Sequence, residues 1–133
     1  MTRRELFGVA AALVVLAMAC EKSDAPADPV WGKQACASCS MLIGDRRYAA
    51  QAVQGGERKY FDDIGCMVVW MESQKTKPEH AWVRSADGWA DATTARYAGD
   101  AKTPMDFGLE ARASGGASWD EARALVLAKG KAR

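Results

Sequence analysis

Two thiols and a thioether lie within six residues, at Cys36, Cys39 and Met41, and a second soft pair, Cys66 and Met67, follows further along the chain. Thiolate and thioether sulfur bind monovalent copper well, whereas oxygen and imidazole ligands suit harder ions. A thioether has no proton to lose, so Met41 can bind Cu(I) at any pH, while each cysteine must ionise first. The cluster therefore points first to Cu(I).

The residues around the Cys36-x-x-Cys39 pair separate the alternative chemistries. Attachment of c-type haem needs a histidine directly after the second cysteine, and Ser40 stands there instead. A structural zinc site commonly uses two such pairs, and this chain has one pair, Cys66 and one histidine. A thioredoxin-like pair opens a helix after a core strand, and residues 28–35 show no strand pattern. Soft-metal binding is favoured, while zinc, redox catalysis and a plain disulfide stay open.

Three further residue types could supply ligands. Met105 lies in a predicted loop over residues 103–108, where no periodicity assigns it to a core, so it is a second-rank copper ligand. His80 is the only histidine and stands at the start of a predicted strand, where a surface role is more common. Asp62 and Asp63 precede a predicted helix, and we expect them chiefly to cap it, with one of them available to face the metal loop.

The N-terminal residues form a targeting signal. A short basic segment precedes an apolar run over residues 6–18, which is too short to span a membrane well and is typical of a secretory signal peptide. The run ends with a small residue directly before Cys20, which resembles the lipobox of bacterial lipoproteins. We therefore expect a lipoprotein signal peptide over 1–19 and a lipidated flexible tether over 20–30. Two or more acyl chains on Cys20 would give firm membrane anchoring.

With Cys20 set aside, Cys36, Cys39 and Cys66 remain, an odd number of thiols. Exported proteins meet an oxidising compartment in which paired thiols form disulfides. At least one thiol is therefore left without a disulfide partner, and a metal ligand is one explanation for it.

Length and charge limit the other classes of function. At 133 residues the chain has room for one folded domain, which we place at residues 31–133. The formal net charge is only +1, so there is no electrostatic case for binding nucleic acid. No Ser/His/Asp set and no phosphate-binding loop occurs in the sequence. We therefore do not predict an enzyme.

The first half of the domain shows a hairpin followed by a helix. Residues 47–53 and 57–61 have strand-like content and are separated by the turn signal Gly55-Gly56. Apolar residues at helical spacing then predict a helix over about 63–74. Gly65 in its first turn weakens the helix by about 1 kcal/mol relative to alanine, so we expect a close approach of another segment there.

The same order of a strand pair and a helix recurs more loosely over residues 93–129. Strands are predicted at 80–84 and 109–113, with further extended chain over 89–97, and Ser118 begins a last helix with capping-box spacing. The fold class is therefore α+β, with small mixed sheet units carrying one helix each. A duplicated ββα-type unit would divide the domain near 31–85 and 86–130.

Several motifs together resemble the NosL family of copper-binding lipoproteins, and the resemblance spans nearly the whole chain after the signal peptide. These motifs are the lipobox Cys20, Cys36-Ala-Ser-Cys39-Ser-Met41-Leu-Ile43, Tyr48-Ala-Ala-Gln51, Tyr60-Phe61-Asp62-Asp63-Ile64-Gly65-Cys66-Met67, Trp82-Val83 and Thr103-Pro104-Met105. The combination is specific, although each motif alone is weak.

The resemblance implies a periplasmic Cu(I) chaperone, held on a bacterial membrane by its lipid, that helps to assemble the copper centres of nitrous oxide reductase or supplies another copper-accepting protein. It also implies a small duplicated strand-and-helix fold. Carried over to this chain, the implied metal ligands are Cys36, Cys39, Met41, Cys66, Met67 and Met105. The alternative is a lipid-anchored thiol–disulfide oxidoreductase that uses the Cys36-x-x-Cys39 pair.

Two residues depart from the family pattern. Ser40 stands where the family usually has glycine between cysteine and methionine, and Asp106 stands where glycine commonly follows Pro-Met. The first departure concerns the approach of Met41 to the metal, and the second concerns the loop that carries Met105.

Overall fold

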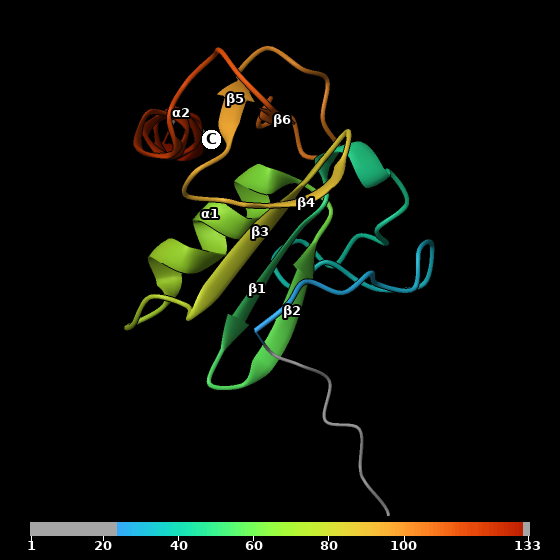
Figure 1. The fold of residues 1–133 in the computed structure, drawn as a ribbon. Helices are drawn as coiled ribbons and strands as arrows, with labels where there is room; N and C mark the ends of the chain where they lie inside the picture. Colours follow the sequence, from blue (N-terminus) through green and yellow to red (C-terminus); the bar gives the residue numbers. More distant parts are fainter. Residues whose placement is uncertain (1–23, 132–133) are drawn as a thin grey trace, which may run out of the picture.

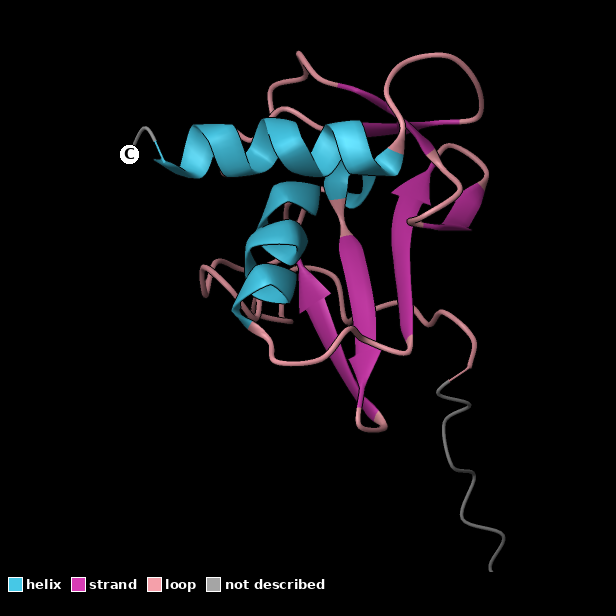
Figure 2. Cartoon of the chain, turned by 90° about the vertical axis from the view of Figure 1, so that its left-hand side faces the viewer, coloured by secondary structure: helices cyan, strands magenta, loops and turns pink. Residues whose placement is uncertain are grey.

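The computed structural model describes residues 24–131 and confirms the α+β class. A four-stranded antiparallel sheet in the order β2-β1-β3-β4, a two-stranded sheet, β5-β6, and two helices make up the described fold (Figure 1). The helix α1 covers one face of the larger sheet, and α2 lies across one end of α1 (Figure 2). The predicted signal peptide and Cys20 lie outside the described residues.

The hairpin predicted around Gly55-Gly56 is confirmed. Strand β1 (Ala50–Gln54) pairs antiparallel with β2 (Glu57–Phe61), and Gln54 faces Glu57 across a two-residue turn. Both turn glycines have positive φ, which the type of turn that matches the strand twist requires. The chain before β1 differs from the prediction: Arg46–Tyr48 forms a 3₁₀ turn, η1, because the Asp45 carboxylate accepts a hydrogen bond from the backbone N–H of Arg47.

Helix α1 (Ile64–Ser73) follows β2 after two aspartates, close to the predicted bounds. Asp63 is its N-cap and accepts a hydrogen bond from the backbone N–H of Gly65 at 2.8 Å. The apolar stripe of the helix is buried against the sheet, and Trp70 packs on Phe61 with ring centroids 5.4 Å apart. The start of α1 is therefore fixed beside the C-terminal end of β2.

Strands β3 (His80–Ser85) and β4 (Gly88–Asp91) form the second hairpin of the large sheet. The prediction of continuous extended chain over 89–97 is wrong. The Asp91 carboxylate accepts hydrogen bonds from the backbone N–H and the hydroxyl of Thr93, and this turn separates β4 from the next strand. The β3–β4 hairpin also crosses the predicted division of the domain at residue 85.

The second ββ-helix arrangement consists of β5 (Arg96–Ala98), β6 (Glu110–Arg112) and α2 (Trp119–Lys131). Ser118 caps α2 as predicted, since its hydroxyl accepts a hydrogen bond from the backbone N–H of Glu121. The ring of Tyr97 is buried against Trp119. The chain thus contains a β-hairpin followed by a helix twice, with the β3–β4 hairpin between them.

Residues 25–28, which the sequence predicts as part of a flexible tether, lie on the face of the large sheet opposite α1. The fully buried amide of Gln51 donates a hydrogen bond to the carbonyl of Ala27 and accepts one from its N–H. Asp28 accepts a hydrogen bond from the indole N–H of Trp89 at 2.8 Å. This part of the predicted tether therefore packs on the domain, and residues 20–23 lie outside the described chain.

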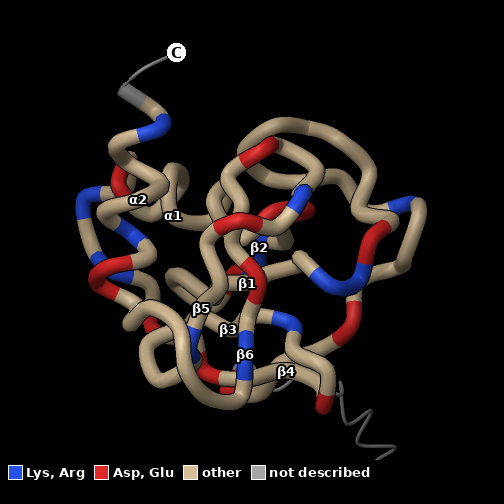
Figure 3. The backbone as a smooth tube through the Cα atoms, turned by 90° about the horizontal axis from the view of Figure 1, so that it is seen from above, with Lys and Arg blue, Asp and Glu red and all other residues tan. Residues whose placement is uncertain are grey.

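Charged residues of both signs are distributed along the described backbone rather than gathered at one side (Figure 3). Neither helix within residues 24–131 is long and apolar enough to cross a membrane.

Candidate metal centre

The Cys36-x-x-Cys39 pair lies in a tight turn that local hydrogen bonds close. The backbone N–H of Cys36 donates to the carbonyl of Met41 at 2.8 Å, and that of Ser40 donates to the carbonyl of Cys36 at 3.0 Å. The N–H of Ala37 donates to the carbonyl of Tyr60 in β2. The turn is therefore fixed against the end of the strand that leads into α1.

Cys66 lies in the first turn of α1, and Asp62 directly follows β2. The Sγ atoms of Cys36, Cys39 and Cys66 and a carboxylate oxygen of Asp62 all lie within 4.8 Å of one another. Cys36 and Cys66 are buried, whereas Cys39 is partly exposed. The structure thus brings the three sequence-predicted thiols into one cluster that opens to solvent at Cys39.

The three thiols differ in their readiness to ionise. The Cys66 thiol donates a hydrogen bond to Cys36 and lowers the pKa of Cys36 to about 6, against the opposing effect of burial, and backbone N–H groups support the thiolate. The same hydrogen bond, together with burial, raises the pKa of Cys66. Burial is the main cause that raises the pKa of Cys39 to about 12. Cys36 is therefore the thiol of the cluster that loses its proton most readily.

The two aspartates before α1 have separate roles, although the sequence predicts both chiefly as caps. Asp63 is the cap, and its second oxygen accepts a hydrogen bond from the backbone N–H of Met105 at 2.9 Å. Asp62 faces the cysteines and accepts a hydrogen bond from the thiol of Cys39 at 3.3 Å. The sequence signal for this role is the Asp-Asp doublet itself, because only one of the two can be the N-cap.

The three predicted thioether ligands lie in different environments. Met41 is 54% exposed beside the turn, Met67 is fully buried in the core, and Met105 is half-buried against that core. Asp63 links the Met105 loop to the start of α1 through the hydrogen bond already described. The methionines stay predictions as ligands, with Met41 on the solvent side of the cysteine turn.

The two departures from the resembled family pattern have a common backbone feature. Ser40 has φ of +67° and Asp106 has φ of +61°, and these are the only residues other than glycine with positive φ in the described chain. This left-handed region favours glycine. Both positions thus keep a glycine-like backbone conformation, so the Met41 and Met105 loops do not need a glycine to adopt their turns.

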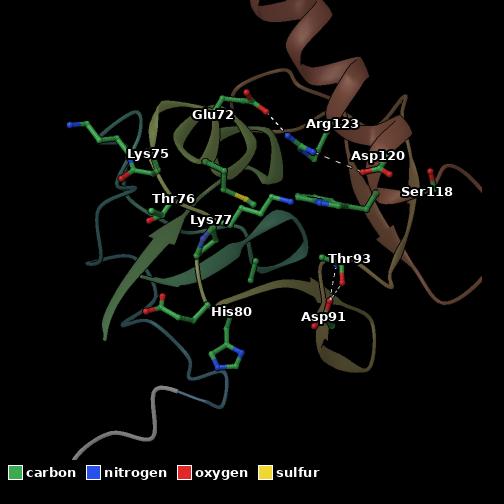
Figure 4. A pocket seen from close by; sticks show the side chains of 16 residues that line it. Glu72, Lys75, Thr76, Lys77, His80, Asp91, Thr93, Ser118, Asp120 and Arg123 are labelled. Atoms are coloured by element: carbon green, nitrogen blue, oxygen red, sulfur yellow. Dashed lines mark hydrogen bonds and ion pairs between the residues drawn. The ribbon is translucent and has the colours of Figure 1, made fainter. Parts of the chain in front are cut away.

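A cavity of about 680 Å³ lies apart from the cysteines, between the C-terminal end of α1, the start of β3 and the start of α2. Figure 4 shows its polar lining, which includes Lys77, His80 and Arg123. His80 stacks on Trp82 in the large sheet. None of the clustered cysteines lines this cavity, so His80 does not join the metal cluster.

Comparison with known proteins gives a structural likeness alone. No protein-family model matches the chain, and no match to a curated protein is found. The fold is similar to the crystal structure of the copper chaperone NosL from Shewanella denitrificans, with a TM-score of 0.59 and 12% sequence identity. The alignment covers 77% of this chain and 87% of that chain. At this identity the likeness shows a NosL-like fold.

Proposed function

We propose that this protein is a copper carrier that binds Cu(I) through Cys36, Cys39 and Cys66. The observation that carries the proposal is the convergence of these three thiols, from two separate segments, within 4.8 Å in a NosL-like fold. Thiolates favour Cu(I). Cys36, whose pKa is lowered by the Cys66 thiol, is the proposed first ligand because it loses its proton most readily.

The exposure of the cluster suits transfer of the ion rather than its permanent retention. Cys39 is partly exposed and the side chain of Met41 reaches solvent, while Cys36 and Cys66 are buried. An acceptor's ligand can therefore approach on the Cys39 side while the buried thiols still hold Cu(I). Exchange of ligands one at a time moves the ion without releasing it to water. No substrate is transformed, so the proposal is a carrier and not an enzyme.

We also propose that the carrier is lipidated at Cys20 after removal of residues 1–19, and that residues 20–30 and 31–133 are its tether and domain. It would then work on the periplasmic side of a bacterial membrane. Its proposed partner is apo nitrous oxide reductase or another copper-accepting protein. The lipobox supports the anchor, and the resemblance in sequence motifs supports the client.

The test is a Cu(I) titration against a competing chelator, without air. The full chain is used in detergent with Cys20→Ser, so that the three clustered thiols are the only ones present. We expect one equivalent or fewer to bind tightly, and binding to be lost in the Cys36→Ser, Cys39→Ser, Cys66→Ser triple variant. Retention of full affinity by the triple variant would overturn the proposal.

The same titration assigns the thioethers. Met41→Leu, Met67→Leu and Met105→Leu each remove one sulfur at nearly constant volume, and Met71→Leu on α1 is the matched control. Replacing a methionine that binds Cu(I) lowers the Cu(I) affinity relative to that control, whereas replacing a methionine that only packs in the core does not.

A thiol–disulfide oxidoreductase is the second candidate, because the lowered pKa of Cys36 is typical of a nucleophilic cysteine. Cys36 is only 3% exposed, and a thiol that attacks a protein disulfide must be reached by it. Turnover of a disulfide substrate, abolished by Cys36→Ser and unaffected by Cu(I) chelators, would favour this candidate over the carrier.

A further inference from the structure

Residues 25–28, which we call the strap, cross the face of the large sheet opposite α1 and are held there by side chains of all four strands. On β1, the buried amide of Gln51 exchanges two hydrogen bonds with the backbone of Ala27. On β2, Arg58 donates a hydrogen bond to the carbonyl of Ala25 at 2.7 Å. These contacts fix the start of the strap beside the β1–β2 hairpin (Figure 1).

The other end of the strap is fixed on β3 and β4. Asp28 forms an ion pair with Arg84 at 3.4 Å and accepts a hydrogen bond from the indole N–H of Trp89 at 2.8 Å. Two prolines, Pro26 and Pro29, favour extended backbone in the residues directly before them. The sequence of the strap therefore suits an extended crossing of the sheet, and the strap belongs to the domain rather than to a flexible tether.

The position of the strap limits how far the domain can lie from a lipid on Cys20. Ala25 is five residues after Cys20, and a fully extended chain spans at most about 3.6 Å per residue, so these two residues lie within about 18 Å of each other. Without the strap contacts, the chain would first be fixed near Trp31, eleven residues after Cys20, and the limit would rise to about 40 Å. The strap thus roughly halves the reach of the tether.

The cysteine turn contacts the same strand at which the strap begins. The backbone N–H of Ala37, in the cysteine turn, donates to the carbonyl of Tyr60 at 2.8 Å. Arg58, which holds Ala25, lies two residues earlier in β2, and two residues span about 7 Å along a strand. Strand β2 is an edge of the large sheet. A short connection to a lipid therefore brings this edge and the cysteine turn toward the membrane together.

We propose that the strap holds the β2 edge of the domain next to a phospholipid bilayer, with the cysteine turn near the membrane surface. This inference rests on the proposed function in taking Cys20 as the lipidated residue. The anchor then sets the orientation of the domain as well as its location, because only residues 20–24 remain as a tether. Release of the strap would let the domain move away from the bilayer and turn freely.

The test measures energy transfer from the tryptophans of the lipidated full chain to a dansyl-labelled phospholipid, in vesicles of phosphatidylethanolamine and phosphatidylglycerol. The strap variant combines Ala27→Pro, which removes the N–H that bonds to Gln51, with Asp28→Ala. Asp24→Ala, just before the strap, is the matched control. An insertion variant keeps the strap and adds about six Gly and Ser residues after Glu21, which lengthens the reach by about 20 Å.

We expect equal transfer efficiency in the parent protein and in Asp24→Ala, and an efficiency lower by about two-fold or more in the strap variant and the insertion variant. The mean distance from Cys20 to the domain grows about 1.5-fold in both, and energy transfer falls steeply with distance. Equal efficiency in the parent protein and the strap variant overturns the inference. If the strap variant does not fold, the insertion variant decides, because it leaves residues 24–131 unchanged, and unaltered transfer then overturns the inference as well.

Failure of this inference can be distinguished from failure of the proposed function. Mass spectrometry of the parent protein extracted from membranes reports the acyl chains on Cys20, and a protein without them refutes both the anchor and the orientation. A lipidated protein whose transfer does not depend on the strap refutes the orientation alone. The Cu(I) titration uses Cys20→Ser, so its result tests the copper carrier independently of both.

Discussion

Ser40 carries a side chain at a backbone position that suits glycine. Its φ of +67° places it in the left-handed region, directly before Met41. An L-residue loses roughly 1–2 kcal/mol there. The hydrogen bond from its N–H to the carbonyl of Cys36 closes the cysteine turn and holds this conformation.

We expect Ser40→Gly to raise the free energy of unfolding by up to about 1 kcal/mol, because relief of the left-handed strain exceeds the roughly 0.5–1 kcal/mol that glycine's greater freedom in the unfolded chain costs. Urea denaturation of the reduced protein measures this change in the free energy of unfolding. Ser38→Gly is the control, since Ser38 lies in the same turn without positive φ, and it should lower stability. If Ser40→Gly and Ser38→Gly lowered the free energy of unfolding equally, the strain inferred at Ser40 would be contradicted.

At this scale the sequence predicted the gathering of the thiols better than the arrangement of the residues around them. The types and spacing of Cys36, Cys39 and Cys66 sufficed to expect a soft-metal cluster, and the structure brings these thiols together. The role of Asp62 could not be predicted, because either of two adjacent aspartates can be the N-cap and only the direction of β2 decides which one faces the turn. Burial of Met67 follows from helical spacing, which cannot distinguish a core sulfur from a ligand.

Helix α1 depends on a glycine where it meets the loop that carries Met105. A Cβ atom added to Gly65 would lie 2.2 Å from both Cβ and Cγ of Phe107. This confirms the close approach expected from a glycine in the first helical turn. The contact seats Phe107 in the core and brings the Met105 loop to the start of α1, where the thiol cluster also lies.

We therefore expect Gly65→Ala to lower the free energy of unfolding by about 1–3 kcal/mol through overpacking, although alanine alone would favour the helix by about 1 kcal/mol. Gly44→Ala is the control, because a Cβ there meets nothing within 4 Å, and its effect should stay within about 0.5 kcal/mol. Urea denaturation of both variants measures these changes in the free energy of unfolding. A stabilised Gly65→Ala protein would show that the Phe107 loop moves freely away from α1.

Element types and order were largely predictable, since the Gly55-Gly56 hairpin, the apolar stripe of α1 and the Ser118 cap are local signals. The break after β4 was not predictable, because Asp91 stops the strand through its side chain, whereas Trp89, Thr93 and Thr94 nearby favour extended chain. Local propensity also could not tell that β4 pairs with β3 and extends the first sheet instead of belonging to a second unit.

On the scale of the whole molecule, residues 25–28, before the cysteine turn, pack on the folded domain. Gln51 is a fully buried amide in the middle of the large sheet, and both of its polar atoms bond to the backbone of Ala27. Arg58 donates to the carbonyl of Ala25 as well. The polar, proline-containing sequence here predicted a tether, because nothing local reveals that a distant buried glutamine would bind its backbone.

We expect Gln51→Ala to lower the free energy of unfolding by about 1–3 kcal/mol, because the N–H of Ala27 loses its acceptor and the Arg58 guanidinium loses its bond to Gln51, although the carbonyl of Ala27 keeps the Tyr60 hydroxyl. Native-state hydrogen exchange should show faster exchange of the Ala27 amide, with little change in α2. Gln34→Ala, on an exposed loop, is the control and should leave both quantities unchanged. A protected Ala27 amide in the Gln51→Ala protein would contradict the docking of this segment by the glutamine.

Tyr97 couples the smaller sheet to α2 and makes stability depend on alkaline pH. Its ring is buried against Trp119, and its hydroxyl donates to the carbonyl of Ala92. Burial, with a contribution from Asp91, raises the pKa of Tyr97 well above its usual value of 10.0. The folded state therefore keeps the proton while the unfolded chain loses it, so the stabilisation is complete below pH 10 and is lost progressively above it.

Because the unfolded tyrosine is only half ionised at pH 10, the stability lost through this group between pH 10 and 11 should be about 1 kcal/mol. Tyr97→Phe loses the hydroxyl's hydrogen bond, worth about 1 kcal/mol at neutral pH, but it also loses this pH dependence. The stability difference between the parent protein and Tyr97→Phe should therefore shrink by about 1 kcal/mol between pH 10 and 11, because all other titrations are common to both proteins. Urea denaturation at pH 8, 10 and 11 measures the free energy of unfolding of both proteins. A difference that stays the same at all three pH values would show that Tyr97 is as free to ionise in the folded protein as in the unfolded chain.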